Sequence, residues 1–67
     1  MRINFDQKND IMRIKFQNGK YHMSQELDNE IIIDMTKDRK IIGIEILDVS
    51  EKIPRKELIE ITVGLSA

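Results

Sequence analysis

Cysteine and tryptophan are absent from this 67-residue chain, and histidine and proline occur once each. The lack of cysteine excludes disulfides, thiolate metal ligands and cysteine nucleophiles, and a lone His22 excludes a histidine-rich metal site. A chain this short buries only about 60% of its unfolded surface, which leaves a thin margin of stability. Because disulfides cannot reinforce the fold, we expect a homo-oligomer, most simply a dimer.

A surplus of charge is also lacking, since 11 Lys and Arg residues stand against 12 Asp and Glu residues, for a formal net charge of -1. General nucleic-acid binders usually carry a basic surplus, and a strand face bearing Arg2, Arg13 and Lys15 has little aromatic support, so nucleic acid is not an expected partner. No apolar run approaches the length of a membrane span, and the N-terminus lacks the apolar stretch of a signal peptide. We therefore expect one small cytoplasmic domain over residues 1–67, without a membrane segment.

A two-residue alternation of apolar and polar side chains is the main pattern present, and it is typical of half-buried strands. It runs through residues 11–16 and stops at Asn18-Gly19, a pair that favours the type I′ turn of a β-hairpin. Folding at this turn would set Ile14 opposite Met23 on one face.

Three further segments alternate in the same way, with Ile3 and Phe5 before the hairpin and residues 30–35 and 40–47 after it. Together they predict a mainly β fold. The expected architecture is a single five-stranded antiparallel meander over residues 3–50, with one continuous apolar face.

The C-terminal residues 51–67 are expected to cover the sheet, to extend it or to mediate dimerisation. Ile53-Pro54 suits the start of a short helix, which would make the fold a β-rich α+β one. Residues 59–65 alternate equally well as a sixth strand, and the sequence leaves both alternatives open.

The second face of the sheet is predicted to be mixed in character and to need a cover. Its candidate binding or interface residues are Ile32, Ile41, Gly43, Glu45 and Leu47. Gly43 would allow a neighbouring segment to come close. The assignment assumes a two-residue turn at Lys37-Asp38. A left-handed Arg39 would flip the final strand, but that conformation costs a non-glycine residue roughly 1 kcal/mol, so we predict the two-residue turn.

Two constellations on that face are candidates for chemistry. Lys15, His22 and Asp34 fall in one cross-strand row, where a carboxylate beside an imidazole can orient a general base. No nucleophile is clearly placed beside them, so a solvated salt-bridge ladder is the simpler interpretation. Glu45 is the other candidate, because a carboxylate in apolar surroundings can work as an acid or base. We favour an ion pair of Glu45 with Arg13, with Lys15 or with a basic group across a dimer interface.

Aspartates gather at the predicted turns, with Asp6 and Asp10 around the first loop and Asp34 and Asp38 around the last. Carboxylates of this kind can bind Mg²⁺ or Ca²⁺. Their spacing is not that of an EF-hand, and aspartate favours turns because its side chain bonds nearby backbone. We therefore interpret them as turn residues and expect no metal and no cofactor.

The segments FDQKNDIMRIKF and IIIDMTKDRKIIGIEILDVS resemble a small prokaryotic family, the domain of unknown function 2283. The resemblance covers residues 3–50, and GIEILDVS is its most specific part. It carries over to Asp6, Asp10, Asp34, Asp38, Gly43, Glu45 and Ser50. Three positions depart from the family pattern, because Phe5 and Arg13 replace tyrosines and Arg39 replaces a turn glycine.

The resemblance implies no activity, since the family has none assigned. The frequent location of its genes beside small toxin-like genes implies a role as a partner or antitoxin-like protein. We therefore predict that the chain functions as a small, homo-oligomeric protein-interaction module and not as an enzyme. The alternative is a carboxylate-based metal-binding or hydrolytic enzyme that uses Asp34, Glu45 and His22.

Overall fold

Five antiparallel strands followed by two helices form the chain in a computed structural model, which describes the backbone of residues 1–66 and the side chains of residues 1–60. The elements are β1 (Arg2–Asp6), β2 (Ile11–Lys15), β3 (Met23–Leu27), β4 (Ile31–Met35), β5 (Ile41–Leu47), α1 (Val49–Lys52) and α2 (Arg55–Ser66). The predicted mainly β fold with a five-stranded antiparallel sheet is confirmed. The C-terminal segment is helical and not a sixth strand, and Ala67 lies outside the described residues.

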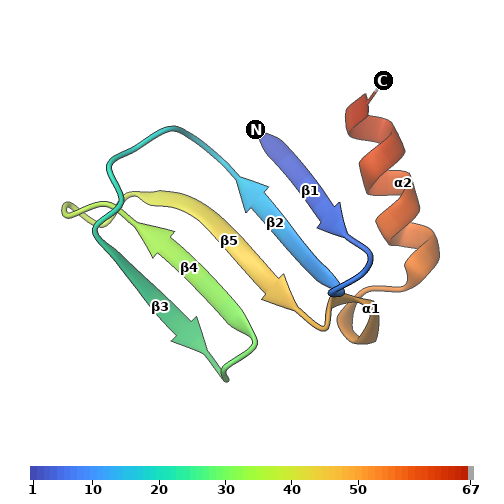
Figure 1. The fold of residues 1–67 in the computed structure, drawn as a ribbon. Coiled ribbons are helices and arrows are strands. Elements are labelled where there is room, and N and C mark those ends of the chain that lie inside the picture. Colours follow the sequence, from blue (N-terminus) through green and yellow to red (C-terminus); the bar gives the residue numbers. More distant parts are fainter. Residues whose placement is uncertain (67) are drawn as a thin grey trace.

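The predicted meander is wrong, because the strands do not lie in the sheet in the order in which they follow one another in the sequence. Along the sheet the strands run β1-β2-β5-β4-β3, so that β5 lies between β2 and β4 (Figure 1). Strands β3, β4 and β5 follow one another as hairpins, and a long connection joins β2 to β3 at the far edge. This is the Greek-key arrangement of four antiparallel strands.

The predicted hairpin at Asn18-Gly19 does not form. Neither residue has a positive φ, and residues 16–22 instead pass along the ends of β5 and β4. The Phe16 N–H donates to the Ile42 carbonyl (2.8 Å) on this path. A Cβ on Gly19 would lie 3.0 Å from Thr36 Cγ2. The glycine therefore allows this segment to pass close to Thr36 and does not form a turn.

A left-handed tight turn does occur, but between β3 and β4. Asp28 and Asn29 have φ values of 51° and 59°, and the Glu30 N–H donates to the Leu27 carbonyl (3.0 Å). Three residues, Asp28, Asn29 and Glu30, connect the two strands. Asparagine and aspartate tolerate this conformation best among residues with a side chain.

The turn between β4 and β5 also differs from prediction, because Arg39 does adopt a left-handed conformation (φ 66°). On its own this change would move β5 to the opposite face. A second irregularity next to Asp34 shifts the register again, so that Gly43 lies opposite Asp34 and not beside Ile32. The two shifts together move β5 by two residues, and Glu45 therefore keeps its predicted face.

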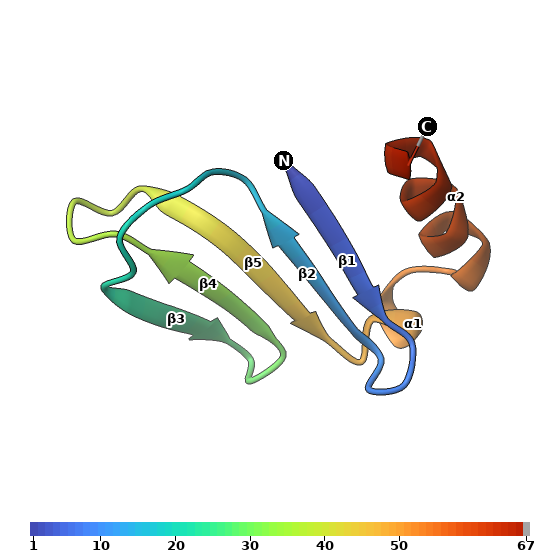
Figure 2. The same cartoon turned by 45° about the horizontal axis from the view of Figure 1, so that its top comes forward.

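The hydrophobic core lies between one end of the sheet and the helices. Met12, Val49 and Leu58 are at most 1% exposed, and they come from β2, α1 and α2. The apolar side chains packed around them are Ile3, Phe5, Ile14, Ile46 and Ile53. Figures 1 and 2 show α2 beside β1, at the opposite side of the sheet from β3. The helices therefore cover only the β1–β2 half of the apolar face.

The start of α2 follows the sequence prediction. The Pro54 carbonyl accepts hydrogen bonds from the N–H groups of Glu57 (2.9 Å) and Leu58 (3.1 Å), so the helix begins directly after the proline. Docking of Leu58 fixes the helix on the sheet, which a segment of this length needs because short isolated helices are marginal in water. Over the described residues, no helix is long and apolar enough to cross a membrane.

Candidate functional surfaces

The apolar face of the sheet continues beyond the helices across β5, β4 and β3. The register sets Ile33 opposite Ile44, and Ile31 opposite both Ile46 and Leu27. We use the name open apolar face for Met23, Leu27, Ile31, Ile33, Met35 and Ile44. Met23 and Leu27 are 44% and 43% exposed. Large apolar side chains thus line up on one face without a second layer over them.

Charged side chains of the same strands project from the opposite face. Asp34 pairs with Ser24, and Glu26 pairs with Ile32, both on the other side of the sheet. The one polar side chain in line with the open apolar face is Gln25, which lies opposite Ile33. The strand positions of this face therefore carry no charge.

The second face, which we call the polar face, holds the basic residues of β1 and β2. Arg13 lies between Asn4 and Glu45, and its guanidinium is 3.6 Å from the Glu45 carboxylate. The expected ion pair of Glu45 with a basic neighbour is confirmed. With the side chains of Arg13 and Glu45 48% and 27% exposed, water screens the pair and its contribution to stability is small.

Gly43 marks the point where β2 and β5 approach most closely. A Cβ at this position would lie 2.6 Å from the Ile14 carbonyl oxygen. The predicted close approach is confirmed, and its neighbour is the backbone of the same chain.

A shallow cavity of about 390 Å³ lies on the polar face. Its lining residues are Arg2, Asn4, Arg13, Ile14, Lys15, Gly19, Tyr21, Asp34, Ile42, Gly43, Ile44 and Glu45. Strands β1, β2 and β5 form its floor, and the connection from β2 to β3 contributes Gly19 and Tyr21. The connection from β2 to β3 and Asp34 of β4 thus complete the lining of the cavity.

The predicted row of Lys15, His22 and Asp34 is not formed. The observed row runs from Lys15 through Gly43 to Asp34 and then to Ser24. His22 lines a different hollow at the end of the sheet. Asp34 and Glu45 thus share one cavity, and the imidazole that a general base would need is not among its lining residues.

Tyr21 is tied to the sheet by a short chain of hydrogen bonds. The Ser24 hydroxyl donates to Asp34 Oδ1 (2.6 Å), so the Tyr21 hydroxyl, 2.8 Å away, donates to Ser24 Oγ. Tyr21 as a whole residue remains 60% exposed. Sequence reasoning missed this arrangement because it depends on the path of residues 16–22.

The predicted interface residues are divided between different places. Ile32, Gly43, Glu45 and Leu47 lie on the polar face. Gly43 and Glu45 are in register with Lys15 and Arg13 of β2, whereas Leu47 lies opposite Ile11 and Ile32 lies opposite Glu45. Ile41 lies beyond the register shift, opposite Met35, and is 42% exposed.

Two of the family aspartates fix turns. Asp6 accepts hydrogen bonds from the side chain of Asn9 (2.9 Å) and from its backbone N–H (3.1 Å), and these lower the pKa of the Asp6 carboxyl. Asp38 accepts a hydrogen bond from the Thr36 hydroxyl, which lowers the pKa of the Asp38 carboxyl. Both act as the turn residues that the sequence predicts. The same prediction is wrong for Asp34, which lies within β4 and pairs with Ser24 and Gly43.

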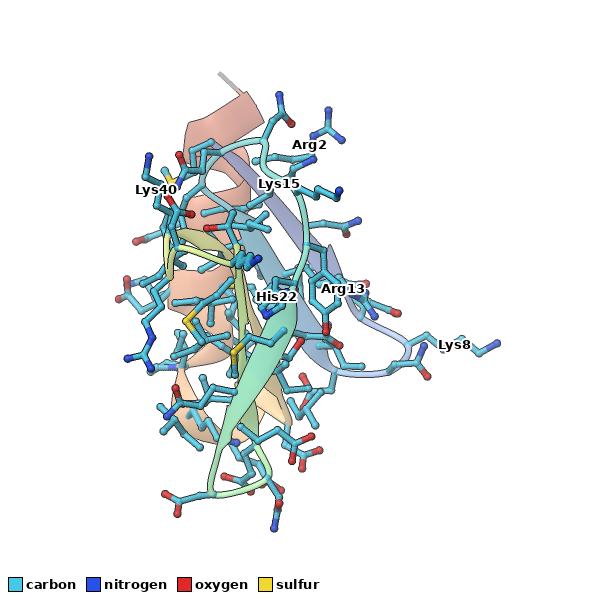
Figure 3. The ribbon with its side chains drawn as sticks, turned by 90° about the vertical axis from the view of Figure 1, so that its left-hand side faces the viewer. Arg2, Lys8, Arg13, Lys15, His22 and Lys40 are labelled. Carbon is cyan, nitrogen blue, oxygen red and sulfur yellow. The ribbon has the colours of Figure 1, made fainter. Side chains whose placement is uncertain are left out.

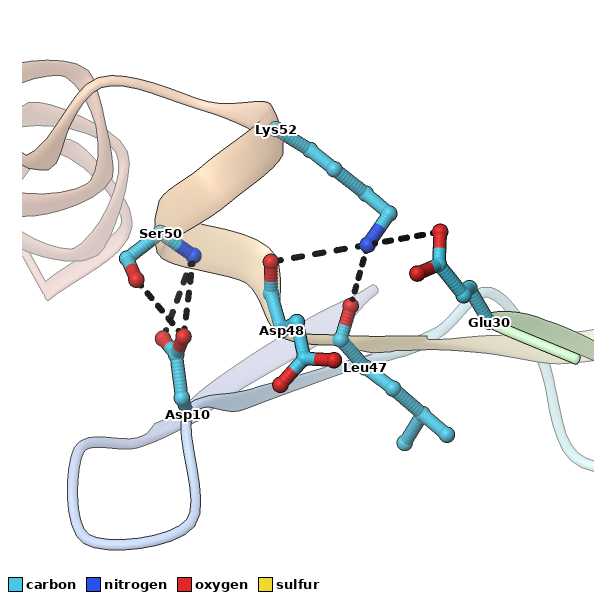
Figure 4. A network of polar contacts seen from close by, with 6 residues as sticks. All are labelled: Asp10, Glu30, Leu47, Asp48, Ser50 and Lys52. Carbon is cyan, nitrogen blue, oxygen red and sulfur yellow. Dashed lines mark hydrogen bonds and ion pairs between the residues drawn. The ribbon is translucent and has the colours of Figure 1, made fainter.

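The remaining family positions join the sheet to α1. Asp10 accepts hydrogen bonds from the backbone N–H of Ser50 (3.1 Å) and from its hydroxyl (2.6 Å), as Figure 4 shows. Beside them, Lys52 Nζ bonds the Leu47 carbonyl (2.7 Å) and pairs with Glu30 (3.1 Å). Within the part of the chain that the structure describes, no three His, Cys, Asp or Glu side chains are grouped to hold a metal ion.

The family-motif residues therefore lie in turns, in paired strands or at the start of α1. No curated protein and no solved structure shows a significant similarity to the chain. A family described as "Protein of unknown function (DUF2283)" matches residues 2–50, which is the sheet together with the first two residues of α1. The chain belongs to this family of proteins of unknown function.

Proposed function

We propose that the chain is a cytoplasmic protein-interaction module that forms a homodimer through its open apolar face. The observation that carries this proposal is the half-covered sheet. Helices α1 and α2 cover the β1–β2 half and pack against Ile46 of β5, while the apolar side chains of β3 and β4 and Ile44 of β5 have no second layer. Sheets are stable in proteins when a second layer buries their apolar face.

A second copy of the chain is the occupant that fits best. A two-fold axis brings identical patches together, so a charged side chain near the axis would meet its own copy. The strand positions of the open apolar face carry none, and Gln25 is able to bond a second Gln25 through its amide. Two sheets packed face to face lie about 10 Å apart, and packed helices have a similar spacing. A second sheet and the helices α1 and α2 therefore fit side by side in one layer.

The small core supports the same conclusion. Only Met12, Val49 and Leu58 are fully buried among the residues whose side chains are described. A core of this size contributes little beyond the conformational entropy that folding costs. Burial between two copies of the area that the six side chains of the open apolar face still expose would add about 25 cal/mol for each Å².

A small protein partner would compete for the same face. The family resemblance suggests an antitoxin-like role, and a partner with an aliphatic surface would exchange with the second copy. A pull-down from native lysate treated with nuclease tests this extension. One stoichiometric small protein that Ile33→Asp fails to retain supports it.

The carboxylate-based enzyme is less well supported by the geometry. Asp34 and Glu45 share the polar cavity, but each is already bonded, to Ser24 and Arg13 respectively. His22 lines a separate hollow. No single arrangement of the three groups around one substrate atom follows from these positions.

Adjacent isoleucines of β4 give a matched test of the dimer. Ile33 belongs to the open apolar face and Ile32 to the polar face, and both are half-buried. We expect Ile33→Asp to weaken dimerisation by about tenfold or more, and Ile32→Asp to leave it nearly unchanged. Sedimentation equilibrium over a range of concentrations measures both.

Met23→Asp provides a second probe, because Met23 is exposed on the edge strand and its replacement leaves the monomer core intact. A wild-type chain that remains monomeric at millimolar concentration would overturn the proposal. So would dissociation by Ile32→Asp with no effect of Ile33→Asp or Met23→Asp, since that result would place the interface on the polar face.

A further inference from the structure

We propose that the cavity on the polar face binds a phosphate-bearing ligand with a flat ring, namely a nucleotide, either free or as a unit of a single strand. This site lies on the face opposite the proposed dimer interface and does not depend on it. Three cationic side chains, one exposed aromatic ring and one amide line the cavity together.

The strongest observation is a pair of like charges. Arg2 and Lys15 lie directly opposite each other on β1 and β2. Cβ atoms of such a pair are about 5 Å apart, and like charges at this distance destabilise a sheet. Over the side chains that the structure describes, neither residue has an ion-pair partner. An anion held between them would remove the repulsion.

The carboxylates of the cavity do not supply that anion. Glu45 is engaged with Arg13 (3.6 Å), and Asp34 accepts the Ser24 hydroxyl (2.6 Å). Arg13 is thus paired with Glu45, whereas Arg2 and Lys15 have no carboxylate at ion-pair distance among the described side chains. Figure 3 shows Arg2, Arg13 and Lys15 projecting from the same side of the sheet, with Lys40 on the other.

Tyr21 supplies a surface for the ring of the ligand. Its hydroxyl is anchored on Ser24, which restrains the orientation of the aromatic ring, and the residue is 60% exposed. Bases stack on such aromatic side chains in proteins that bind single strands. Asn4 lies on β1, opposite Arg13 of β2. Its side-chain amide offers both a donor and an acceptor to a base or sugar.

The dimensions suit one nucleotide unit. A volume of about 390 Å³ lies at the lower end of the range for small-molecule sites. The net charge of -1 means that attraction to an anion comes from this local group of cations and not from the whole chain. Binding should therefore be weak but localised.

The test is a titration of the full chain, followed by amide chemical shifts, with three probes: inorganic phosphate, adenosine monophosphate and an oligouridylate. We expect shifts confined to Lys15, Gly43 and Tyr21 and their neighbours. Replacing Arg2 and Lys15 together by alanine should weaken binding of all three probes by tenfold or more. Tyr21→Ala should weaken binding of the nucleotide and the oligomer but leave phosphate binding unchanged.

The matched control is the double variant Lys8→Ala with Lys56→Ala, which removes the same charge away from the cavity. An equal loss of binding in this control would overturn the proposal, because it would indicate attraction without a site. Absence of shifts at the cavity with every probe would overturn it too. Tighter binding of the oligomer than of the monophosphate identifies a strand as the ligand, and equal binding identifies a free nucleotide.

Discussion

Asp10 and Ser50, forty positions apart in the chain, form the hydrogen bonds that begin α1. The residue at the N-cap position, Asp48, makes no side-chain bond to the helix. The Asp10 carboxylate takes its place, with bonds of 3.1 Å to the Ser50 N–H and 2.6 Å to its hydroxyl. A capping anion from a distant turn thus ties the β1–β2 hairpin to the end of β5.

Removing this cap should destabilise the protein. Asp10→Asn keeps a residue that tolerates the left-handed φ of 57° but weakens the bonds to Ser50. We expect Asp10→Asn and Ser50→Ala each to lower the free energy of unfolding by about 1–2 kcal/mol. The double variant should lose less than the sum, because both changes remove the same contact. Urea denaturation measures all three, and Asp48→Asn, which has no cap bond to lose, is the matched control.

The two described glycines of the sheet region should differ in their tolerance of alanine. A Cβ at Gly43 would lie 2.6 Å from the Ile14 carbonyl, a backbone atom that cannot move without separating β2 from β5. We expect Gly43→Ala to cost about 1–3 kcal/mol. At Gly19 the nearest atoms belong to the side chains of Thr36 and Ile42, which can rotate, so Gly19→Ala should cost clearly less. Equal melting temperatures for the two variants would contradict this account.

Leu58 should hold α2 on the sheet. Its side chain is fully buried against Met12 and Val49, whereas the neighbouring Ile59 is 49% exposed. We expect Leu58→Ala to cost about 2–5 kcal/mol, which approaches the whole stability of so small a domain. Ile59→Ala should stay within about 0.5 kcal/mol of the wild type in the monomer. Hydrogen exchange of the α2 amides would show whether the helix detaches before the sheet unfolds.

Two turn carboxylates should make the protein less stable in acid. Hydrogen bonds from Asn9 and Thr36 lower the pKa of Asp6 and of Asp38 from the ordinary value of 3.8. A carboxyl with a lower pKa in the folded chain stabilises it above the unfolded pKa, and this stabilisation is lost as the pH falls through the folded value. Asp6→Asn and Asp38→Asn should therefore reduce stability near neutral pH, and the difference from wild type should shrink below about pH 3.8. Carbon NMR titration of both carboxyls checks the direction of each shift, and a value above 3.8 for either would refute it.

The positions of the strands could be predicted from the sequence because apolar and polar side chains alternate within each strand. Met12, Ile14, Ile33 and Ile44 lie on the predicted apolar face. The predicted face of Glu45 is correct, but the prediction assumed a turn that does not form. The left-handed Arg39 and the irregularity next to Asp34 each shift the register, and together they restore the predicted face while changing the partners.

The candidate sites were harder to predict than the strands. Glu45 could be paired with Arg13 in advance because both fall at polar positions of apolar strands. His22 could not be placed, since its position depends on where β3 lies. The cavity beside Tyr21 was missed for the same reason, because it forms only where residues 16–22 cross the sheet.

The sequence by itself determined where most strands lie, which face of each is apolar and that Asp6, Asp10 and Asp38 lie at turns, because these depend on neighbours a few positions away. Only the tertiary structure decided the strand order, the helical C-terminus and the half-covered face. The pairing of β2 is a competition between a nearby turn and a distant strand, and rows such as Ile14 with Ile44 and Arg13 with Glu45 favour β5 over the strand that follows Asn18-Gly19. Contacts between residues some thirty positions apart outweigh the local turn preference here, and no local pattern records them.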